Sequence, residues 1–285
     1  MRWALIFAVA VSLGGCGPTA KKDDDKVAVV ASFYPVAYAA QQVGGDLVRV
    51  RNLTPAGVEP HDLELTSDDI DHIDSADAVF LVGSGFQPAV VDAAKRRSKN
   101  TFDVAAGLIR SKDDPHFWLD PTLMADAVYN IRDGLKSADP AHKSTYERNA
   151  NAYVTKLTRL WNDYGTALAH CERKEIVTTH AAFGYLADRF GLTQTSVAGL
   201  SPDAEPSPKR IADLAALIRR DGVTTVFYEE LVPRGFADTL AHDAHVKTAV
   251  LSPLEGLTKQ EQARGETYIT VMRRNLAALK TALGC

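Results

Sequence analysis

The chain has 285 residues and a formal net charge of −4, with 46% hydrophobic and 24% charged residues. These proportions are typical of a globular chain, and the length is sufficient for two domains of ordinary size. The net negative charge and the lack of a basic stripe in the sequence argue against nucleic acid as a partner.

The first residues predict export and lipidation. Arg2 precedes a short apolar run, residues 3–13, and two glycines then lead to Cys16. A run of this length is typical of a signal peptide, because a membrane span needs about 20 residues. Small residues directly before a cysteine resemble a bacterial lipobox, so we expect residues 1–15 to be removed and Cys16 to carry lipid. An ordinary signal peptide with an incidental cysteine is the alternative.

The first half of the chain, after a polar tether at residues 16–26, alternates between strand and helix signals. The expected strands are 27–33, 47–52, 78–82 and 101–104, and the expected helices are 35–43, 67–75, 88–97 and 121–136. Alternation of this kind indicates a mainly parallel sheet flanked by helices.

The middle of the chain predicts one long helix. Residues 142–170 contain no proline and a single glycine, Gly165. Apolar side chains recur there at three- and four-residue spacing: Tyr146, Ala150, Tyr153, Leu157, Leu160, Trp161, Tyr164 and Leu168. A helix over this span would be roughly 40 Å long and would join two lobes as a rigid spine. Two shorter helices broken near Gly165 are the alternative.

The alternation then resumes. The expected strands are 176–179, 193–197, 224–228 and 246–251, and the expected helices are 183–190, 207–220, 233–244 and 265–283. The predicted fold class is therefore α/β, with two lobes that each contain a mainly parallel sheet flanked by helices, joined by one long rigid helix. The expected boundaries are 27–138 for the first lobe, 139–170 for the linking helix and 171–285 for the second lobe.

Three histidines and one glutamate lie where strand-like segments give way to loops. They are His61, His116, His180 and Glu255. Ligands of open α/β sheets bind outside the carboxyl ends of the strands, so all four side chains are expected to face the cleft between the lobes. Neutral imidazoles and one carboxylate form a donor set that suits Zn²⁺. One histidine alone would be an ordinary hydrogen-bonded ring, but four placements that agree with one architecture favour a metal site.

The surrounding motifs resemble those of the metal-binding lipoproteins of bacterial ABC importers for zinc and manganese, and in particular their zinc-binding branch. The segments that carry the resemblance are 60–62, 114–121, 178–185 and 252–258, and the likeness covers residues 27–285. The resemblance implies that His61, His116 and His180 are metal ligands and that an ABC permease is the partner.

The fourth ligand varies in that family. Glu255 is the residue we expect, with Glu59, Glu229 or a water molecule as alternatives. Zinc-binding relatives often carry a histidine-rich loop before the second histidine, but residues 107–114 contain no histidine. Manganese-binding relatives tend to have a carboxylate at the third position, so His180 favours Zn²⁺ over Mn²⁺.

Further acids near the motifs are candidates for supporting contacts. Asp62, Asp114 and Asp120 could each accept the free ring N–H of a ligating histidine and so fix its tautomer, and Glu59 is a fourth such candidate. Ordinary loop capping is the alternative for the three aspartates.

The remaining cysteines predict a disulfide. With Cys16 carrying lipid, Cys171 and Cys285 are left. Two cysteines in an exported protein favour a bridge over two unrelated buried thiols. His242 and His245 are expected to lie on a solvated helix face and not to bind metal.

The sequence thus predicts an extracytoplasmic, lipid-anchored and monomeric protein that captures Zn²⁺ and delivers it to an ABC importer. It predicts no enzyme activity. A manganese-binding homologue is the first alternative and a zinc-dependent hydrolase is the second. The hydrolase is disfavoured because the His-Glu-x-x-His helix motif is missing from the sequence and a fourth protein ligand would close the site. An adhesin without transport would leave the four-residue pattern unexplained.

Overall fold

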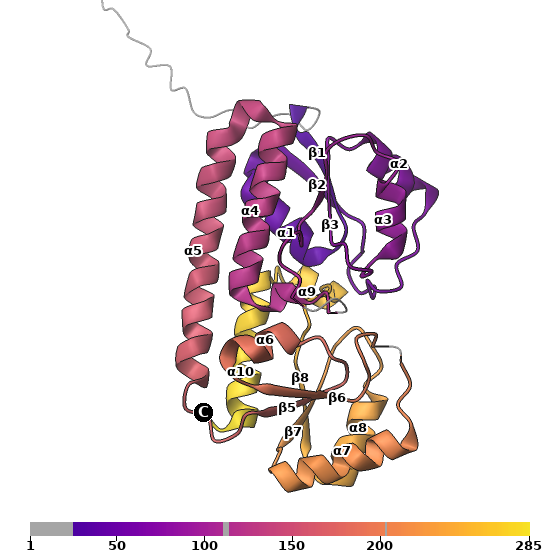
Figure 1. Ribbon diagram of the computed structural model, residues 1–285, viewed down its shortest axis with the longest axis vertical. Coiled ribbons are helices and arrows are strands. Elements are labelled where there is room, and N and C mark those ends of the chain that lie inside the picture. The colour runs from indigo at the N-terminus through magenta and orange to yellow at the C-terminus, as the bar shows by residue number, and fades with distance from the viewer. Residues whose placement is uncertain (1–24, 111–113, 203) are drawn as a thin grey trace, which may run out of the picture.

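The computed structural model describes residues 25–110, 114–202 and 204–285. Figure 1 shows two α/β lobes arranged one above the other along a single long helix, which confirms the predicted fold class. The expected signal peptide, Cys16 and all but the last two residues of the expected tether lie outside the described residues. Within the described ranges, no helix is both long enough and apolar enough to span a membrane.

The first lobe is built on four parallel strands in the order β2-β1-β3-β4. The strands are β1 (Val27–Ala31), β2 (Val48–Asn52), β3 (Ala78–Leu81) and β4 (Thr101–Asp103). The helices are α1 (Tyr34–Gly44), α2 (Ser67–Ser75), α3 (Pro88–Ala94) and α4 (Pro121–Ala138), with short 3-10 turns η2 (Gly45–Leu47), η3 (Phe117–Leu119) and η4 (Pro140–His142). Helices α1 and α4 cover one face of the sheet, and α2 and α3 cover the other (Figure 1).

The second lobe repeats this winding with the order β6-β5-β7-β8. Its strands are β5 (Glu175–Thr178), β6 (Thr193–Ser196), β7 (Thr225–Tyr228) and β8 (Lys247–Val250). Its helices are α6 (Gly184–Phe190), α7 (Pro208–Asp221), α8 (Gly235–Ala244), α9 (Lys259–Ala263) and α10 (Tyr268–Leu283). Helices α7 and α8 pack on the outer face of this sheet.

The long helix is α5 (Lys143–Leu168), which is continuous through Gly165. A side chain at Gly165 would meet no atom within 4 Å, so the glycine does not mark a break or a close approach. Seven of the eight apolar positions expected on one face are buried, but Trp161 is 40% exposed. It lies one residue past Leu160, and a step of one residue turns the side chain about 100° around the helix and off the buried face.

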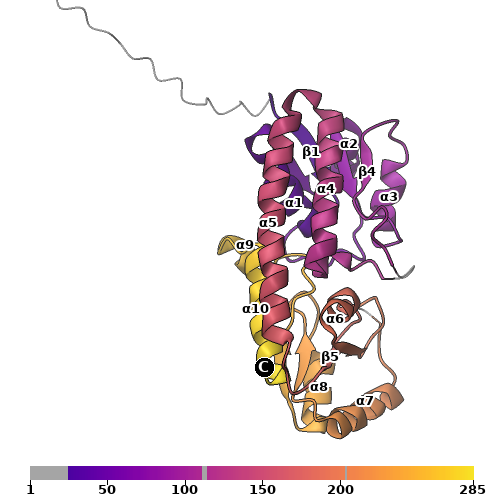
Figure 2. The same ribbon diagram turned by 60° about the vertical axis from the view of Figure 1, so that its left-hand side comes forward.

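Helix α10 returns along α5 and joins the second lobe to the spine (Figure 2). The Tyr164 hydroxyl of α5 donates to the carbonyl oxygen of Met272 in α10 at 2.6 Å. The predicted disulfide is present, with Cys171 and Cys285 joined across a sequence separation of 114 residues. It ties the end of α10 to the chain just after α5.

A single buried core runs between the lobes. It contains the inner faces of both sheets together with side chains of α1, α4, α5, α6 and α10. The outer helix pairs form two smaller cores of their own. The junction of the lobes is therefore part of the main core of the molecule, and loops that enter it are held by packing from both sides.

Candidate metal centre

The four residues predicted from the sequence meet at the junction of the two lobes. His61 comes from the loop after β2, and His116 comes from the loop between β4 and α4. His180 follows β5 after one residue, and Glu255 follows β8. Each therefore leaves the carboxyl end of a parallel strand, where α/β sheets place their ligands.

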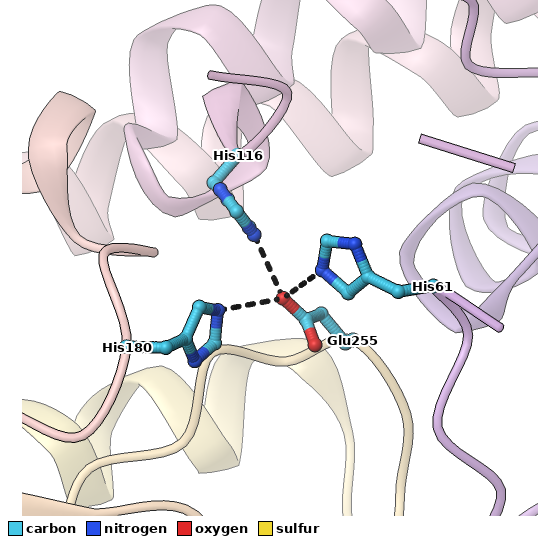
Figure 3. A group of neighbouring side chains, drawn as sticks. All are labelled: His61, His116, His180 and Glu255. Atoms are coloured by element: carbon cyan, nitrogen blue, oxygen red, sulfur yellow. Dashed lines mark hydrogen bonds and ion pairs between the residues drawn. The ribbon is translucent and has the colours of Figure 1, made fainter. Parts of the chain in front are cut away.

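Three imidazole rings point at one carboxylate oxygen of Glu255, as Figure 3 shows. The Nε2 atoms of His116, His61 and His180 lie 2.8, 3.3 and 3.4 Å from Glu255 Oε1. One donor atom from each of the four residues lies within 4.8 Å of all the others. His116, His180 and Glu255 are at most 1% exposed, whereas the side chain of His61 is 13% exposed.

Charge in this cluster is shared between buried groups. Burial raises the pKa of the Glu255 carboxyl, but the close contacts with the rings of His116, His180 and His61 outweigh burial and hold that pKa well below its usual range. Burial lowers the pKa of His180, but the carboxylates of Glu229 and Glu255 outweigh it and raise the pKa to about 10. The pKa of His116 is raised for the same reason, by Asp114 and Glu255. The buried carboxylate thus favours positive charge on the rings of His116 and His180.

Two polar atoms of the cluster are left without a hydrogen bond. His180 Nε2 and Glu255 Oε2 are buried and have no hydrogen-bond partner among the described residues. His180 Nε2 lies within ion-pair distance of Glu255 Oε1 but is not aligned for a hydrogen bond. Buried polar atoms are nearly always paired, so these two are consistent with a site shaped for a ligand.

Two of the rings are oriented by a carboxylate on the far nitrogen. Asp114 Oδ1 lies 2.8 Å from His116 Nδ1, and Glu229 Oε1 lies 2.6 Å from His180 Nδ1. Such a contact keeps the proton on Nδ1 and leaves Nε2 free to bind a cation. From the sequence, Glu229 is one alternative for the fourth ligand. The structure instead places it behind His180, one residue past the end of β7.

The other candidate acids have different contacts. Asp120 accepts from the backbone N–H of Thr122 at the start of α4 and pairs with Arg189 at 2.7 Å, so it caps a helix and contacts no histidine ring among the described residues. Asp62 is exposed. Glu59 Oε1 accepts from the backbone N–H of His61 at 2.9 Å. Burial, followed by the negative charge of Glu255, raises the pKa of Glu59 to about 8.

The ligand-bearing loops also touch across the lobes. Asp114 of the first lobe lies against the start of α6, where a Cβ on Gly184 would come within 2.8 Å of Asp114 Oδ2. The Tyr185 hydroxyl donates to the Asp114 carbonyl oxygen at 3.2 Å. The acid that orients His116 is therefore itself held by the second lobe.

Two α/β lobes with a ligand site between them are the architecture of the substrate-binding proteins that serve transporters. The sequence profile of the family described as ZnuA, zinc-uptake complex component A, periplasmic, matches residues 29–282. The chain belongs to this family.

Relatives of known name and structure agree with that assignment. The zinc-binding lipoprotein AdcA of Streptococcus pneumoniae is 36% identical over 282 residues, which cover 91% of this chain and 56% of that protein. The chain thus spans little more than half the length of this relative. The high-affinity zinc uptake system protein ZnuA of Bacillus subtilis is 36% identical and covers 99% of this chain and 98% of its own. The Zn(II)-bound ZnuA-like domain of S. pneumoniae AdcA superimposes with a TM-score of 0.81 at 38% identity, covering 91% of this chain and 100% of that domain.

Proposed function

We propose that this chain binds one Zn²⁺ through His61, His116, His180 and Glu255, outside the cytoplasm, and delivers it to an ABC permease. The observation that carries the proposal is the convergence of four donor atoms within 4.8 Å of one another at the buried junction of the lobes. Relatives that are named for zinc binding and zinc uptake support the same cargo.

The donor set favours zinc over manganese. Three imidazole nitrogens and one carboxylate oxygen make a softer site than the oxygen-rich sites that suit Mn²⁺. The number of donors also equals the four positions of tetrahedral zinc. A manganese-binding protein remains the alternative to be tested directly.

Capture and release fit the site better than hydrolysis does. A catalytic zinc keeps a coordination position for water, whereas four protein donors would fill a tetrahedral shell. Three of these donor residues are at most 1% exposed, which suits sequestration of an ion. We therefore propose a transport receptor and not an enzyme.

The remaining features of the proposal come from the sequence. We propose that Cys16 carries a lipid that holds the chain at the cell membrane on its extracytoplasmic side, and that the chain acts as a monomer. We also propose that residues 27–138 and 171–285 behave as two lobes linked by residues 139–170. The unbroken helix α5 in that linker supports small lobe shifts on metal release in place of wide hinge closure.

Competitive titration with a chromogenic zinc chelator tests the proposal. Wild type should bind one Zn²⁺ tightly per chain, and Mn²⁺ should compete poorly. Glu255→Ala should weaken zinc binding, because it removes a ligand and leaves the three imidazoles, two of them buried, without their counter-charge. Glu64→Ala is the matched control, since Glu64 is exposed and outside the cluster.

The possible outcomes separate the alternatives. Weak or multiple zinc binding, or preference for Mn²⁺, would reject zinc capture. Tight zinc binding that does not depend on Glu255 would move the fourth ligand to Glu59 or to water.

A further inference from the structure

The loop that carries Glu255 is held by side chains from other parts of the chain. The amide of Asn275 in α10 makes two hydrogen bonds with Ser252: Ser252 N donates to Asn275 Oδ1 at 2.9 Å, and Asn275 Nδ2 donates to the Ser252 carbonyl oxygen at 2.7 Å. The indole Nε1 of Trp118 donates to the carbonyl oxygen of Pro253 at 2.8 Å. Asn275, Ser252 and Trp118 are each at most 3% exposed. We call these three hydrogen bonds the loop clamp.

An unusual backbone conformation separates the loop clamp from the ligand. Leu254 has a φ of 56°, in the left-handed region that non-glycine residues rarely adopt. Its side chain is fully buried. A residue keeps such a conformation only where the surrounding structure imposes it, and here the two preceding residues are fixed by the loop clamp. The direction in which the chain enters Glu255 therefore depends on these contacts.

Helix α10 connects the Glu255 loop to the loop of a second ligand. The hydroxyl of Tyr268, two turns before Asn275, donates to the carbonyl oxygen of Trp118. Trp118 lies two residues after His116 in the chain. One side of α10 therefore holds both the loop of His116 and the loop of Glu255, and the Nε1 bond of Trp118 joins the two loops directly.

We propose that Asn275 and Trp118 are positioning residues of the metal site, which hold the left-handed turn at Leu254 so that the Glu255 carboxylate is in place before metal arrives. The inference rests on the proposed function, because it assumes that Glu255 is a ligand. A ligand that is already ordered loses little conformational freedom on binding, so its contribution to affinity is larger. Without the loop clamp, Leu254 is free to return to negative φ. Metal binding then has to fix the conformation of Glu255, and this loss of conformational freedom lowers the affinity.

Two variants break the loop clamp at different points. Asn275→Ala removes both bonds to Ser252, and Trp118→Phe removes only the N–H donor while keeping an aromatic ring. We expect Asn275→Ala to weaken zinc binding about 10-fold, in the range seen for residues that support metal ligands, and Trp118→Phe to weaken it less. Zinc should also dissociate faster from both variants. If Asn275→Ala folds poorly, Trp118→Phe carries the test.

The control is an asparagine with the same kind of bond far from the metal. Asn149 of α5 donates from Nδ2 to the carbonyl oxygen of Val43 at 3.0 Å. Asn149→Ala should lower the unfolding temperature without changing zinc affinity. Loading with Co²⁺ gives a second measurement, because its visible absorption depends on the ligands around the ion. The Co²⁺ spectrum of Asn275→Ala should move toward that of Glu255→Ala.

A double-mutant cycle distinguishes positioning from a general loss of stability. In a Glu255→Ala background, Asn275→Ala and Trp118→Phe should cost little further affinity, because the ligand that they position is gone. The inference is overturned if both variants bind zinc as wild type does while Glu255→Ala binds weakly, or if their losses persist in the Glu255→Ala background. If wild type itself fails to bind zinc, or if Glu255→Ala binds as wild type does, the proposed ligand set fails and the inference fails with it.

Discussion

The four proposed ligands differ in how firmly the protein holds them. His116, His180 and Glu255 are at most 1% exposed, and each is held by a further contact: Asp114 on His116, Glu229 on His180 and the loop clamp on the Glu255 loop. The side chain of His61 is 13% exposed and packs edge to face against Phe86, with 4.7 Å between the ring centroids.

This difference suggests a division of roles. In the proposed site, the three buried donors would define the position of the ion. His61 lies in the long loop between β2 and α2 and is the partly exposed member of the group. It is the ligand that we expect to move first when zinc enters or leaves, because loops with fewer buried contacts open most easily.

The strongest test of this comparison replaces the buried ligand His116 and the partly exposed ligand His61 by alanine in separate variants. Structural zinc sites bind with about 10–16 kcal/mol shared over four ligands, so one ligand accounts for on the order of 3 kcal/mol, or about 100-fold in affinity. We expect His116→Ala to reach at least that loss, since it also leaves Glu255 and Asp114 without their buried partner. His61→Ala should lose less, because water can enter at its partly exposed position and replace the ring.

Competition titrations of both variants against wild type measure the difference. His242→Ala serves as the control, since its side chain is 87% exposed and lies outside the four-residue cluster. Equal losses for His116→Ala and His61→Ala would show that these two ligands are held alike and would contradict the comparison.

A second prediction concerns pH. The pKa of His180, raised to about 10, means that in the metal-free protein this ring holds a proton at neutral pH. That proton must leave before Nε2 can bind zinc, so affinity should fall by about tenfold for each unit of pH below 10. A histidine with its usual pKa of about 6.5 would instead place the onset near that pH. Chelator competition between pH 6 and 8 checks the slope, and a flat profile would contradict it.

The free energy of unfolding of the metal-free protein should fall as pH rises, whereas zinc affinity should increase. Because the pKa of His180 is higher in the folded than in the unfolded state, its protonation stabilises the folded protein. This stabilisation is fully present below the unfolded pKa of about 6.5 and is lost as pH rises through 10. Zinc binding stabilises more strongly as pH rises over the same range. The difference in unfolding temperature between zinc-loaded and metal-free protein should therefore widen from pH 6 to pH 8.

The fold could be predicted from the sequence because the patterns that indicate its strands and helices are local. Alternating strand and helix patterns predicted the eight strands now seen in the two sheets and the single spine α5. The helix that the prediction omitted, α9, has five mostly polar residues and little periodicity. Its capping box of Thr258 and Glu261 was the one local signal that could have identified it.

Only part of the site could be predicted from the sequence. The four proposed ligands could be found because each follows a predicted strand, and parallel strands end at one edge of a sheet. The contact of Asp114 with His116 is local and could be expected from the sequence, but other supporting contacts join residues far apart. Positions 180 and 229, which hold His180 and Glu229, differ by 49, and Trp118 and Pro253 differ by 135. No local pattern marks such pairs. Asp120 shows the converse, since its place beside a ligand motif suggested a ring contact, whereas tertiary packing directs it to Arg189.

The variant with the smallest expected effect tests whether a contact from the second lobe helps to orient His116. Gly184→Ala places a Cβ within 2.8 Å of Asp114 Oδ2, and Asp114 also holds both the backbone N–H and the Nδ1 of His116. Because a contact under 3 Å requires a shift, Asp114 should move and carry the His116 ring with it. We expect zinc affinity to fall only about 3-fold, below the 10–100-fold range for deleting a supporting residue outright.

The matched control is Gly235→Ala. Gly235 is also the first residue of a helix, α8, and a Cβ there would meet no atom within 4 Å. Alanine favours helix over glycine by about 1 kcal/mol at most, so both variants should be at least as stable as wild type apart from the clash at Asp114. A loss of affinity in Gly184→Ala alone, measured by chelator competition, therefore reflects the displaced aspartate and not weaker folding. If the two variants bind zinc equally well, the contact between Gly184 and Asp114 does not help to orient His116, and the firm hold on that ligand must come from the first lobe and α10.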